Sequence, residues 1–423
     1  MATAASLRGL RQMRSKSSAS TAPGKRIPSV KSATHLPALA SAFLHLLTQC
    51  HNLSESLKRE TFMPAVTLSE VARAAGVSPA TASRVLNGSS RIPGADIAER
   101  VKAAAAALGY IPNAQAQALA RSSSGLLGLI VHDIADPYFS SIARGVQSAA
   151  RELNKILLLT STEGTPSEER LAVEAFTSRR ADAIVLAGSR STRPEDDAAN
   201  SALLREAYRY LANGGRLVLA GHDLVDPSAH ESRGHGDAAF TVGTPPVLID
   251  IPNESLACRL ARALGGQGHS RFLIVAGPEG LMTSDLRVAG FQRGLAEQGL
   301  ESAEVLRAAF NRDGGFGAAL ELEDKVREAA DSGNPYCIFA VNDRMAMGVV
   351  AALRHCGLQA PADYAVAGFD DINTLEDFIP GLTTVRLPLE EIGRSAAEAA
   401  LTGADPAPAS GEVVLRESTA PAS

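Results

Sequence analysis

Residues 67–88 read TLSEVARAAGVSPATASRVLNG, and this stretch predicts two short helices joined by a tight turn. Thr67 followed three residues later by Glu70 forms a capping box that opens the first helix. Gly76 then supplies the left-handed residue that ends it. The first helix has an apolar face at helical spacing, made by Leu68, Val71, Ala72 and Ala75.

The second helix opens at Ser78, which can cap it, with Pro79 at the first helical position, and it runs to about Leu86. A third helix is expected over residues 96–108, with Ile97, Val101, Ala104 and Leu108 on one face. Two helices linked by a short turn that contains Gly are typical of the helix-turn-helix motif. The second helix of that motif enters the major groove of DNA.

In its detail this stretch closely resembles the DNA-binding headpiece of the LacI family of bacterial transcription regulators. Position 82 departs from the family, because it is Ala where Val is common. Family members usually begin a few residues before the T-L-x-x-V-A motif, so the resemblance implies Met63 as the biological start. Residues 1–62 are then expected to be a disordered extension or a mis-assigned start, and they show no motif.

The side chains of the second helix suggest their own roles. Pro79 and Ala80 face base edges but donate no side-chain hydrogen bond, whereas Arg84 can read guanine through two hydrogen bonds. Hydroxyl and amide side chains are better suited to phosphates, which position a protein without specifying sequence. The expected phosphate contacts are Thr67, Ser78, Thr81, Ser83 and Asn87.

Residues 109–120, GYIPNAQAQALA, extend the resemblance. In the family, an x-P-N segment precedes a short hinge helix that orders on DNA, and a leucine from it wedges into the minor groove. Leu119 occupies that position, with Ala116 one turn earlier; the alternative is an ordinary linker leucine. Gln115 and Gln117 stand where the family often has Arg, which implies a shallower salt dependence of binding.

The net charge of −5 conceals a gradient along the chain. Residues 1–62 carry +7, residues 63–121 carry +3, and residues 122–423 carry −15. A basic end on an acidic body indicates that a polyanion is met at one end only.

Composition excludes several classes of protein. The four cysteines lie far apart, with no metal-ligand spacing, so neither a zinc site nor a disulfide framework is expected, and no other cofactor is indicated. The longest apolar run, residues 36–47, is too short to cross a bilayer, so no membrane partner is expected. The first 26 residues, Arg/Ser-rich and without an acid, have the composition of a transit peptide. A reducing cytoplasm, with the protein at the bacterial nucleoid, is the expected location.

After the hinge, near-continuous apolar runs alternate with helical stretches, which is the pattern of parallel sheets covered on both faces. About 300 residues exceed one doubly wound lobe, so two lobes with a cleft are expected, and ligands bind at the carboxyl ends of such strands. The strand-like runs are 125–134, 155–162, 181–188, 215–221, 271–277, 336–343 and 364–371.

These regions resemble the periplasmic-binding-protein-like effector domain of the LacI family. The matching pieces are DIADPYF (133–139), RVAGF (287–291), VNDRMAMG (341–348), VAGFDD (366–371), PGLTTVRLP (380–388) and VVLREST (413–419). With the headpiece, the resemblance covers residues 66–420. The implied fold is therefore an all-α helix-turn-helix headpiece followed by an α/β domain of two lobes with doubly wound parallel sheets.

Carried over by position, the resemblance implies effector contacts whose carboxylates, amides and flat aromatic rings suit a polyhydroxylated ligand. These contacts are Asp136, Tyr138, Phe139, Arg287, Phe310, Asn342, Asp343 and Asp370. Alternatives stay open: either Phe could be core, Asp343 could cap a helix, and Arg287 could form an interdomain salt bridge.

Two segments of the body depart from the family. Pro252 and Asn253 replace an Asp-Asn pair that is common there. The long polar stretch 190–245 contains three irregularly spaced histidines, His222, His230 and His235, which are expected to be solvated in a loop rather than to bind a metal.

No enzyme motif occurs in a suitable context, and an enzyme is not expected. The expected function is sequence-specific transcriptional regulation, most simply repression, by a homodimer on a pseudo-palindromic operator in double-stranded DNA. A small ligand, expected to be a sugar, would bind between the lobes and change DNA affinity allosterically. The alternatives are a regulator that answers to a partner protein, and a periplasmic-type sugar-binding protein. The second lacks support, because it needs a signal peptide and no helix-turn-helix.

The expected division of the chain has four parts. An extension at 1–62 precedes the headpiece (64–111), the hinge helix and linker (112–122), and the body (125–423), which binds the effector and dimerises.

Overall fold

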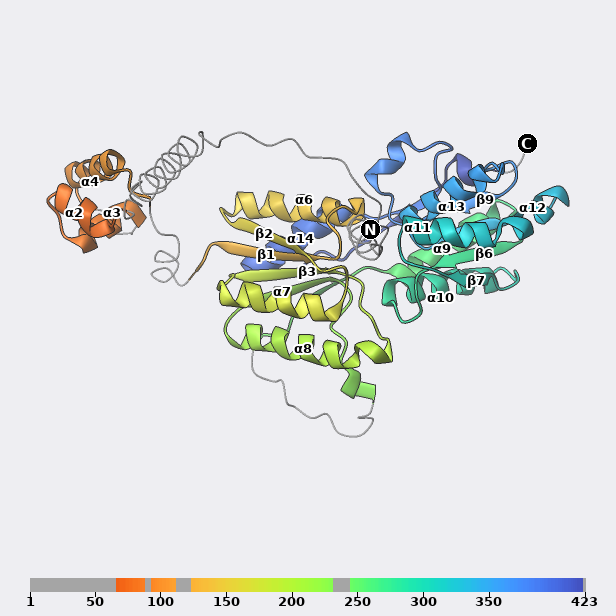
Figure 1. Ribbon diagram of the computed structural model, residues 1–423, viewed down its shortest axis with the longest axis horizontal. Helices are drawn as coiled ribbons and strands as arrows, with labels where there is room; N and C mark the ends of the chain where they lie inside the picture. The colour runs from red at the N-terminus through yellow and green to blue at the C-terminus, as the bar shows by residue number, and fades with distance from the viewer. Residues whose placement is uncertain (1–65, 88–92, 112–122, 231–243, 421–423) are drawn as a thin grey trace, which may run out of the picture. The chain divides into compact units, whose positions relative to one another are not determined.

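The computed structural model describes residues 66–87, 93–111, 123–230 and 244–420 (Figure 1). Contacts divide the chain into two units, residues 1–111 and 112–423. The first contains the headpiece and the second contains the body. Within the four described ranges, no helix has the length and apolar character needed to cross a membrane.

The described part of the headpiece consists of α2 (Leu68–Ala74), α3 (Pro79–Asn87) and α4 (Ala95–Leu108). The capping box forms as predicted, because Thr67 N donates to Glu70 Oε2 at 2.7 Å and Glu70 N donates back to Thr67 Oγ1. Gly76 has the expected left-handed φ of 65°. A small core holds the three helices together; its buried members are Val71, Ala72, Ala75, Ala82, Val101 and Ala105.

Lobe 1 of the body is a five-stranded parallel sheet in the order β2-β1-β3-β4-β5. Its strands are β1 (Leu126–Val131), β2 (Ile156–Ser161), β3 (Ala183–Gly188), β4 (Arg216–Gly221) and β5 (Val247–Asp250). Helices cover both faces, with α6 packed on α14 and α7 packed on α8 (Figure 1). These helices are α6 (Pro137–Glu152), α7 (Pro166–Ser178), α8 (Asp197–Ala212) and α14 (Leu389–Thr402).

Lobe 2 is a four-stranded parallel sheet in the order β7-β6-β8-β9. Its strands are β6 (Phe272–Ala276), β7 (Glu304–Arg307), β8 (Cys337–Ala340) and β9 (Ala365–Ala367). Here α9 packs on α10 and α11 packs on α13. The helices are α9 (Asn253–Gly266), α10 (Met282–Ala296), α11 (Arg312–Glu321), α12 (Glu323–Asp331) and α13 (Asp343–His355).

The lobes are joined by three crossings of the chain. It leaves lobe 1 after β5, returns after β10 (Thr384–Arg386) to form α14, and leaves again before β11 (Glu412–Val414). Strands β10 and β11 pair antiparallel and form the hinge between the lobes. Short 3₁₀ turns complete the body at Pro194–Asp196, Pro227–His230, Asn373–Asp377 and Glu417–Thr419.

The alternation of strands and helices was predicted correctly, and all seven predicted strands are present. The run 336–343 ends as a strand at Ala340, because Asn342 already caps α13. The run 364–371 ends at Ala367, because the chain turns at Asp370 and Asp371, whose φ angles are 118° and 52°. Strands β5, β7, β10 and β11 were not predicted; they have only three or four residues, several of them exposed.

Candidate functional site

The cleft between the lobes holds a cavity of about 580 Å³ at the carboxyl ends of the strands. Both lobes contribute to its wall. It brings together seven of the eight predicted effector residues, Asp136, Tyr138, Phe139, Arg287, Phe310, Asn342 and Asp370.

Three of these residues lie between the end of β1 and the first turn of α6: Asp136, Tyr138 and Phe139. Asp136 is the N-cap of α6, and its Oδ1 accepts from Tyr138 N at 3.0 Å, with Pro137 at the first helical position. Tyr138 and Phe139 meet edge to face, with ring centroids 4.9 Å apart. Phe139 belongs to the hydrophobic core and lines the cavity as well, so the core and ligand roles are not exclusive. The sequence DPYF thus presents a carboxylate and two rings to the cavity.

Arg287 lies on α10 in lobe 2 and is only 2% exposed. Its Nε donates to Asn253 Oδ1 at 2.8 Å, its Nη1 to Val341 O at 2.7 Å and its Nη2 to Asp370 Oδ1 at 2.8 Å. The guanidinium also stacks on the ring of Phe369, 3.8 Å from its centroid. The salt bridge of Arg287 therefore lies within lobe 2 and not between the lobes.

Burial raises the pKa of Asp370 to about 7, although the charge of Arg287 opposes the shift. Burial, with the charge of Asp370, also raises the pKa of Tyr138, so its phenol stays protonated and can donate a hydrogen bond. The cavity therefore offers both an acceptor and a donor to a ligand hydroxyl.

The prediction that Asp343 faces the cleft is wrong. Asp343 is fully buried, and its carboxylate accepts from Thr384 Oγ1 at 2.6 Å and from Ile372 N at 3.0 Å. Burial raises its pKa to about 6. The helix cap is instead its neighbour Asn342, whose Oδ1 accepts from Met345 N at 2.7 Å. Asn342, at the cap of α13, lines the cavity, whereas Asp343, in the first turn, points away from it and ties α13 to β10 through Thr384.

Several cavity residues were not predicted. His132 directly precedes the DIADPYF segment, Asp133 is its first residue, and Arg344 lies inside the VNDRMAMG segment, so the positional signal was present for each. Asn253 was noted only as a departure from the family, yet it lines the cavity and holds Arg287. Ser189 comes from the loop after β3, which belongs to none of the segments that resemble the family.

Arg344 connects the lobes at the mouth of the cleft. Its Nη1 lies 3.1 Å from Asp136 Oδ2 and 3.6 Å from Asp133 Oδ2. Arg344 belongs to lobe 2 and both carboxylates belong to lobe 1. The two aspartates therefore form ion pairs with this guanidinium across the two lobes.

A second connection, which we term the interlobe strap, joins residues 189–192 of lobe 1 to residues 280–283 of lobe 2. It is a short antiparallel contact in which Met282 N donates to Arg190 O at 3.0 Å. The side chain of Arg190 turns back into lobe 1, where Nη1 lies 3.0 Å from Glu169 Oε1 and both residues are buried. Burial alone would raise the pKa of Glu169, but the charges of Arg190 and His132 lower it.

His222 corrects the prediction of solvated loop histidines. It is only 4% exposed, and its Nε2 lies 2.8 Å from Thr283 Oγ1 on the opposite lobe. Burial lowers its pKa to about 4, and the charges of Arg190 and Arg287 contribute. The reason is its position directly after β4, where its side chain packs beside the interlobe strap and contacts Thr283. His235 lies outside the described residues.

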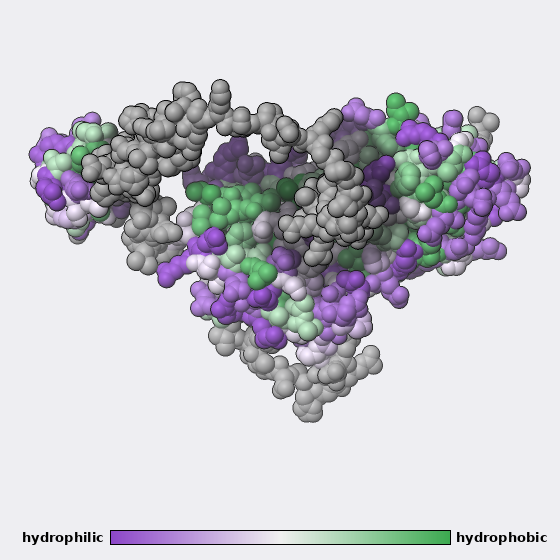
Figure 2. Space-filling model, in the orientation of Figure 1, coloured by the Kyte–Doolittle hydropathy of each residue, from purple (hydrophilic) through white to green (hydrophobic). Residues whose placement is uncertain are grey.

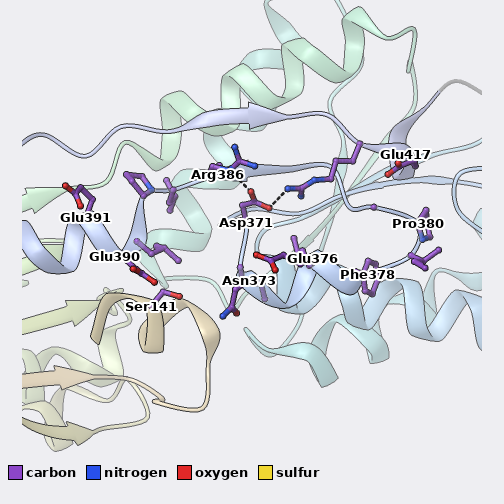
Figure 3. A pocket seen from close by; sticks show the side chains of 18 residues that line it. Ser141, Asp371, Asn373, Glu376, Phe378, Pro380, Arg386, Glu390, Glu391 and Glu417 are labelled. Carbon is purple, nitrogen blue, oxygen red and sulfur yellow. Dashed lines mark hydrogen bonds and ion pairs between the residues drawn. The ribbon is translucent and has the colours of Figure 1, made fainter. Parts of the chain in front are cut away.

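A larger cavity, of about 950 Å³, lies on the hinge side of the body (Figure 3). It contains none of the predicted effector residues, and its wall is formed mainly by residues 371–391. Asp371 lies at its edge, with its carboxylate 2.7 Å from Arg386 Nε and 2.7 Å from Arg416 Nη2. Adjacent aspartates thus face different sites: Asp370 faces the cavity of about 580 Å³ in the cleft, and Asp371 binds Arg386 and Arg416 at the hinge strands.

The predicted DNA-binding residues of the headpiece lie on α3 and at the start of α2. Pro79, Ala80 and Arg84 are exposed, and within the described residues Arg84 has no ion pair. Hydrogen bonds among the polar residues are local: Thr81 N donates to Ser78 Oγ at 3.1 Å, and Asn87 Nδ2 to Ser83 Oγ at 2.9 Å. Thr67 is exposed at the cap of α2. Ala116, Leu119, Gln115 and Gln117 lie outside the described residues.

Comparisons with known proteins agree with both parts of this architecture. Residues 67–113 match the bacterial regulatory proteins of the lacI family, and residues 261–420 match the periplasmic binding protein-like domain. The HTH-type transcriptional regulator GalS of Salmonella typhimurium (strain LT2) is 31% identical over 341 residues, 80% of this chain and 90% of GalS.

Two solved structures are similar as well. The transcriptional regulator CelR in complex with cellobiose shares 27% identity at a TM-score of 0.55, covering 84% of this chain and 99% of CelR. The Lac repressor dimer bound to operator and the anti-inducer ONPF shares the fold, at 24% identity and a TM-score of 0.64, with the same coverage of both chains. The chain belongs to the LacI family of bacterial transcription regulators.

Proposed function

We propose that the protein is a transcriptional repressor whose affinity for a pseudo-palindromic operator is controlled by a sugar or related polyhydroxylated metabolite bound between the lobes. It works in the cytoplasm, at the nucleoid. The observation that carries this proposal is the cavity of about 580 Å³, because both lobes supply its hydrogen-bonding groups. A ligand there contacts both lobes at once and so fixes their relative angle.

The ligand is hydroxyl-rich. Asp136 and Asp370 offer carboxylate oxygens, Asn342 offers an amide, and the rings of Tyr138 and Phe310 offer flat apolar faces. Such a set suits the alternating hydroxyl and C–H faces of a sugar. The solved complex of CelR with cellobiose, at 27% identity, supports the same class.

The ligand is also uncharged. Both guanidinium groups of the cavity already have carboxylate partners, Arg287 with Asp370 and Arg344 with Asp136. The helices that begin at the cavity are capped by Asp136, Asn311 and Asn342, so their first amides are occupied. A phosphate or carboxylate group on the ligand would lie among acidic side chains and would find no unpaired group of hydrogen-bond donors. The free-energy cost of removing its charge from water would therefore not be compensated.

DNA recognition depends on the headpiece and the segment after it. Arg84 reads a guanine, Pro79 and Ala80 approach base edges, and the polar residues Thr67, Ser78, Thr81, Ser83 and Asn87 contact phosphates. Leu119, with Ala116 beside it, wedges into the minor groove at the centre of the operator.

The protein acts as a homodimer formed through its bodies. Strand β2 is an edge strand of lobe 1, and hydrophobic residues gather over it on the surface (Figure 2). Ile156 is 62% exposed and Leu159 is 38% exposed. A second copy that covers this edge would remove the apolar surface from water and protect the unpaired strand.

The test is selection of bound duplexes by the full chain from a randomised pool. We expect enrichment of a pseudo-palindrome whose half-sites are about one helical turn apart. Leu119→Ala should weaken binding of the selected duplex, and Arg84→Ala should relax the preference at one position per half-site. Failure to enrich any sequence would contradict the proposed function.

A further inference from the structure

One edge of lobe 1 is defined by the amino ends of its parallel strands. Leu126 of β1 lies beside Ile156 of β2, and Ala183 of β3 lies beside Arg216 of β4. The body begins at this edge, because residue 123 is its first described residue and β1 starts at Leu126. The chain that comes from the headpiece therefore enters the described part of the body at this edge.

Asp182 fixes the point at which the chain enters the body. Its carboxylate accepts from Ser124 N at 2.7 Å and from Gly125 N at 3.0 Å. It also accepts from Ser123 Oγ at 2.7 Å and from Lys155 Nζ at 2.8 Å. The Asp182 carboxylate is thus fully hydrogen-bonded, and Lys155 neutralises its charge.

At the same edge, where α6 and α7 end and β2 and β4 begin, lie five cationic residues that we term the basic edge: Arg151, Lys155, Arg179, Arg180 and Arg216. Three of them line a cavity of about 680 Å³ beside Asp182, namely Lys155, Arg180 and Arg216. The four arginines are exposed, and among the described residues none has a carboxylate within ion-pair distance.

Elsewhere the body pairs most of its arginines with acids, as in Arg144 with Glu390 and Arg170 with Glu174. Near the basic edge, Glu152 forms its ion pair with Arg394 and not with a residue of the basic edge. Exposed cations without acidic partners are unusual in a body that carries a net charge of −15. Their position at the entry of the chain calls for an anionic partner there.

We propose that the basic edge contacts the phosphate backbone of the DNA that the headpiece holds. Eleven residues, 112–122, span at most about 40 Å when fully extended, so a duplex held by the headpiece lies within reach of this edge. Without local cations the acidic body would repel the duplex. The inference rests on the proposed DNA-binding function and adds a second, sequence-independent contact surface outside the headpiece.

The test is a pair of charge-matched double variants of the full chain. R151Q/R180Q removes two cations of the basic edge, and neither side chain makes a hydrogen bond or ion pair with a described residue. R205Q/R354Q is the control; it removes two exposed arginines that also lack described partners but lie in the middle of α8 and at the end of α13. Both variants change the net charge equally and should fold like the parent.

The measurement is the affinity for a duplex of arbitrary sequence over a range of KCl concentrations. For R151Q/R180Q we expect roughly tenfold weaker binding at low salt, and a log–log salt slope shallower by about 2, since each lost phosphate contact removes about 0.9. The control should match the parent. If the parent binds and R151Q/R180Q binds identically, the inference is wrong while the proposed function stands.

Two further outcomes would also overturn the inference. If the parent binds no duplex at any salt concentration, the proposed function fails and the inference falls with it. The second outcome comes from thermal melting of the parent and of R151Q/R180Q with inorganic phosphate as the only added ligand. If phosphate stabilises the parent but not R151Q/R180Q, while DNA binding is equal in both, the basic edge is a site for small anions.

Discussion

Arg287 and Asp370 form an ion pair, 2.8 Å between Nη2 and Oδ1, with both residues at most 5% exposed on the wall of the effector cavity. Arg287 also holds Asn253, and Asp370 precedes Asp371, which clamps the hinge through Arg386. The pair therefore stands between the ligand and the strands that connect the lobes. A ligand hydroxyl that competes for the Asp370 carboxylate acts directly on this connection.

Replacing one partner of this pair should destabilise the body strongly, because it leaves a buried charge without compensation. Arg287→Met should lower the free energy of unfolding by about 3–5 kcal/mol, whereas R287M/D370L should recover most of that loss. Urea unfolding followed by circular dichroism measures both. A double variant as unstable as the sum of the two single variants would contradict the ion-pair assignment.

Anionic ligands should bind worse than their neutral parents. Melting of the full chain with D-galactose, D-ribose and cellobiose, and with the sugar phosphates of the first two, should show stabilisation only by neutral compounds. The reason is that the cavity guanidinium groups of Arg287 and Arg344 are already paired. A sugar phosphate that stabilises the chain more than its parent sugar would show this charge argument to be wrong.

Lowering the pH should destabilise the folded chain through His222, whose side chain contacts Thr283 of the interlobe strap. Its pKa is lowered to about 4 in the folded chain, against 6.5 for an unperturbed histidine. Below pH 6.5 the unfolded chain therefore binds a proton that the folded chain does not, so stability falls as the pH drops. Between pH 6.5 and 5 the free energy of unfolding should fall by about 1.5 kcal/mol.

His222→Gln keeps a group that can bond to Thr283 but does not titrate. We expect it to remove most of that acid-dependent loss, measured as the change in melting temperature between pH 6.5 and 5. His355 is exposed at the end of α13, so His355→Gln is the control and should leave the pH dependence as in the parent. An unchanged pH profile in the His222 variant would be incompatible with a buried neutral histidine.

Helices α6 and α14 approach each other through glycines. A Cβ on Gly145 would collide with the carbonyl of Glu390, and one on Gly393 would collide with the carbonyl of Ile142. Gly145→Ala should therefore cost about 1–3 kcal/mol of stability through overpacking. Gly266→Ala, also on a helix but with nothing within 4 Å of the added methyl, should cost nothing or stabilise slightly. Equal effects of the two in urea unfolding would argue against this close contact.

Much of the fold could be predicted from the sequence, because its elements carry local signals. Thr67 with Glu70 and Gly76 define α2 through capping alone, and long buried runs such as residues 181–188 identify central strands. The hinge strands β10 and β11 have three residues each. Their pairing depends on crossings between the lobes, which leave no periodic pattern in the chain.

The candidate site was predictable where residues follow strand ends in recognisable segments, as Asp136 and Asn342 do. It was not predictable where side-chain direction decides. Asp343 follows Asn342 directly, yet its carboxylate is bound to Thr384 and Ile372 on the opposite side. His222 is buried by a strap that lobe 2 completes, and 60 residues of sequence separate it from Thr283, so no local pattern could reveal the contact.

The most direct test of the central claim, that a ligand between the lobes controls DNA affinity, is the Kd for the selected operator with and without a sugar that stabilises the chain. Allosteric control through the cleft should change this Kd by roughly 5- to 150-fold at saturating sugar. The same change should be absent in Asn342→Ala, which loses a cavity amide. An operator Kd that stays the same while the sugar is bound would show that the ligand between the lobes does not control DNA affinity.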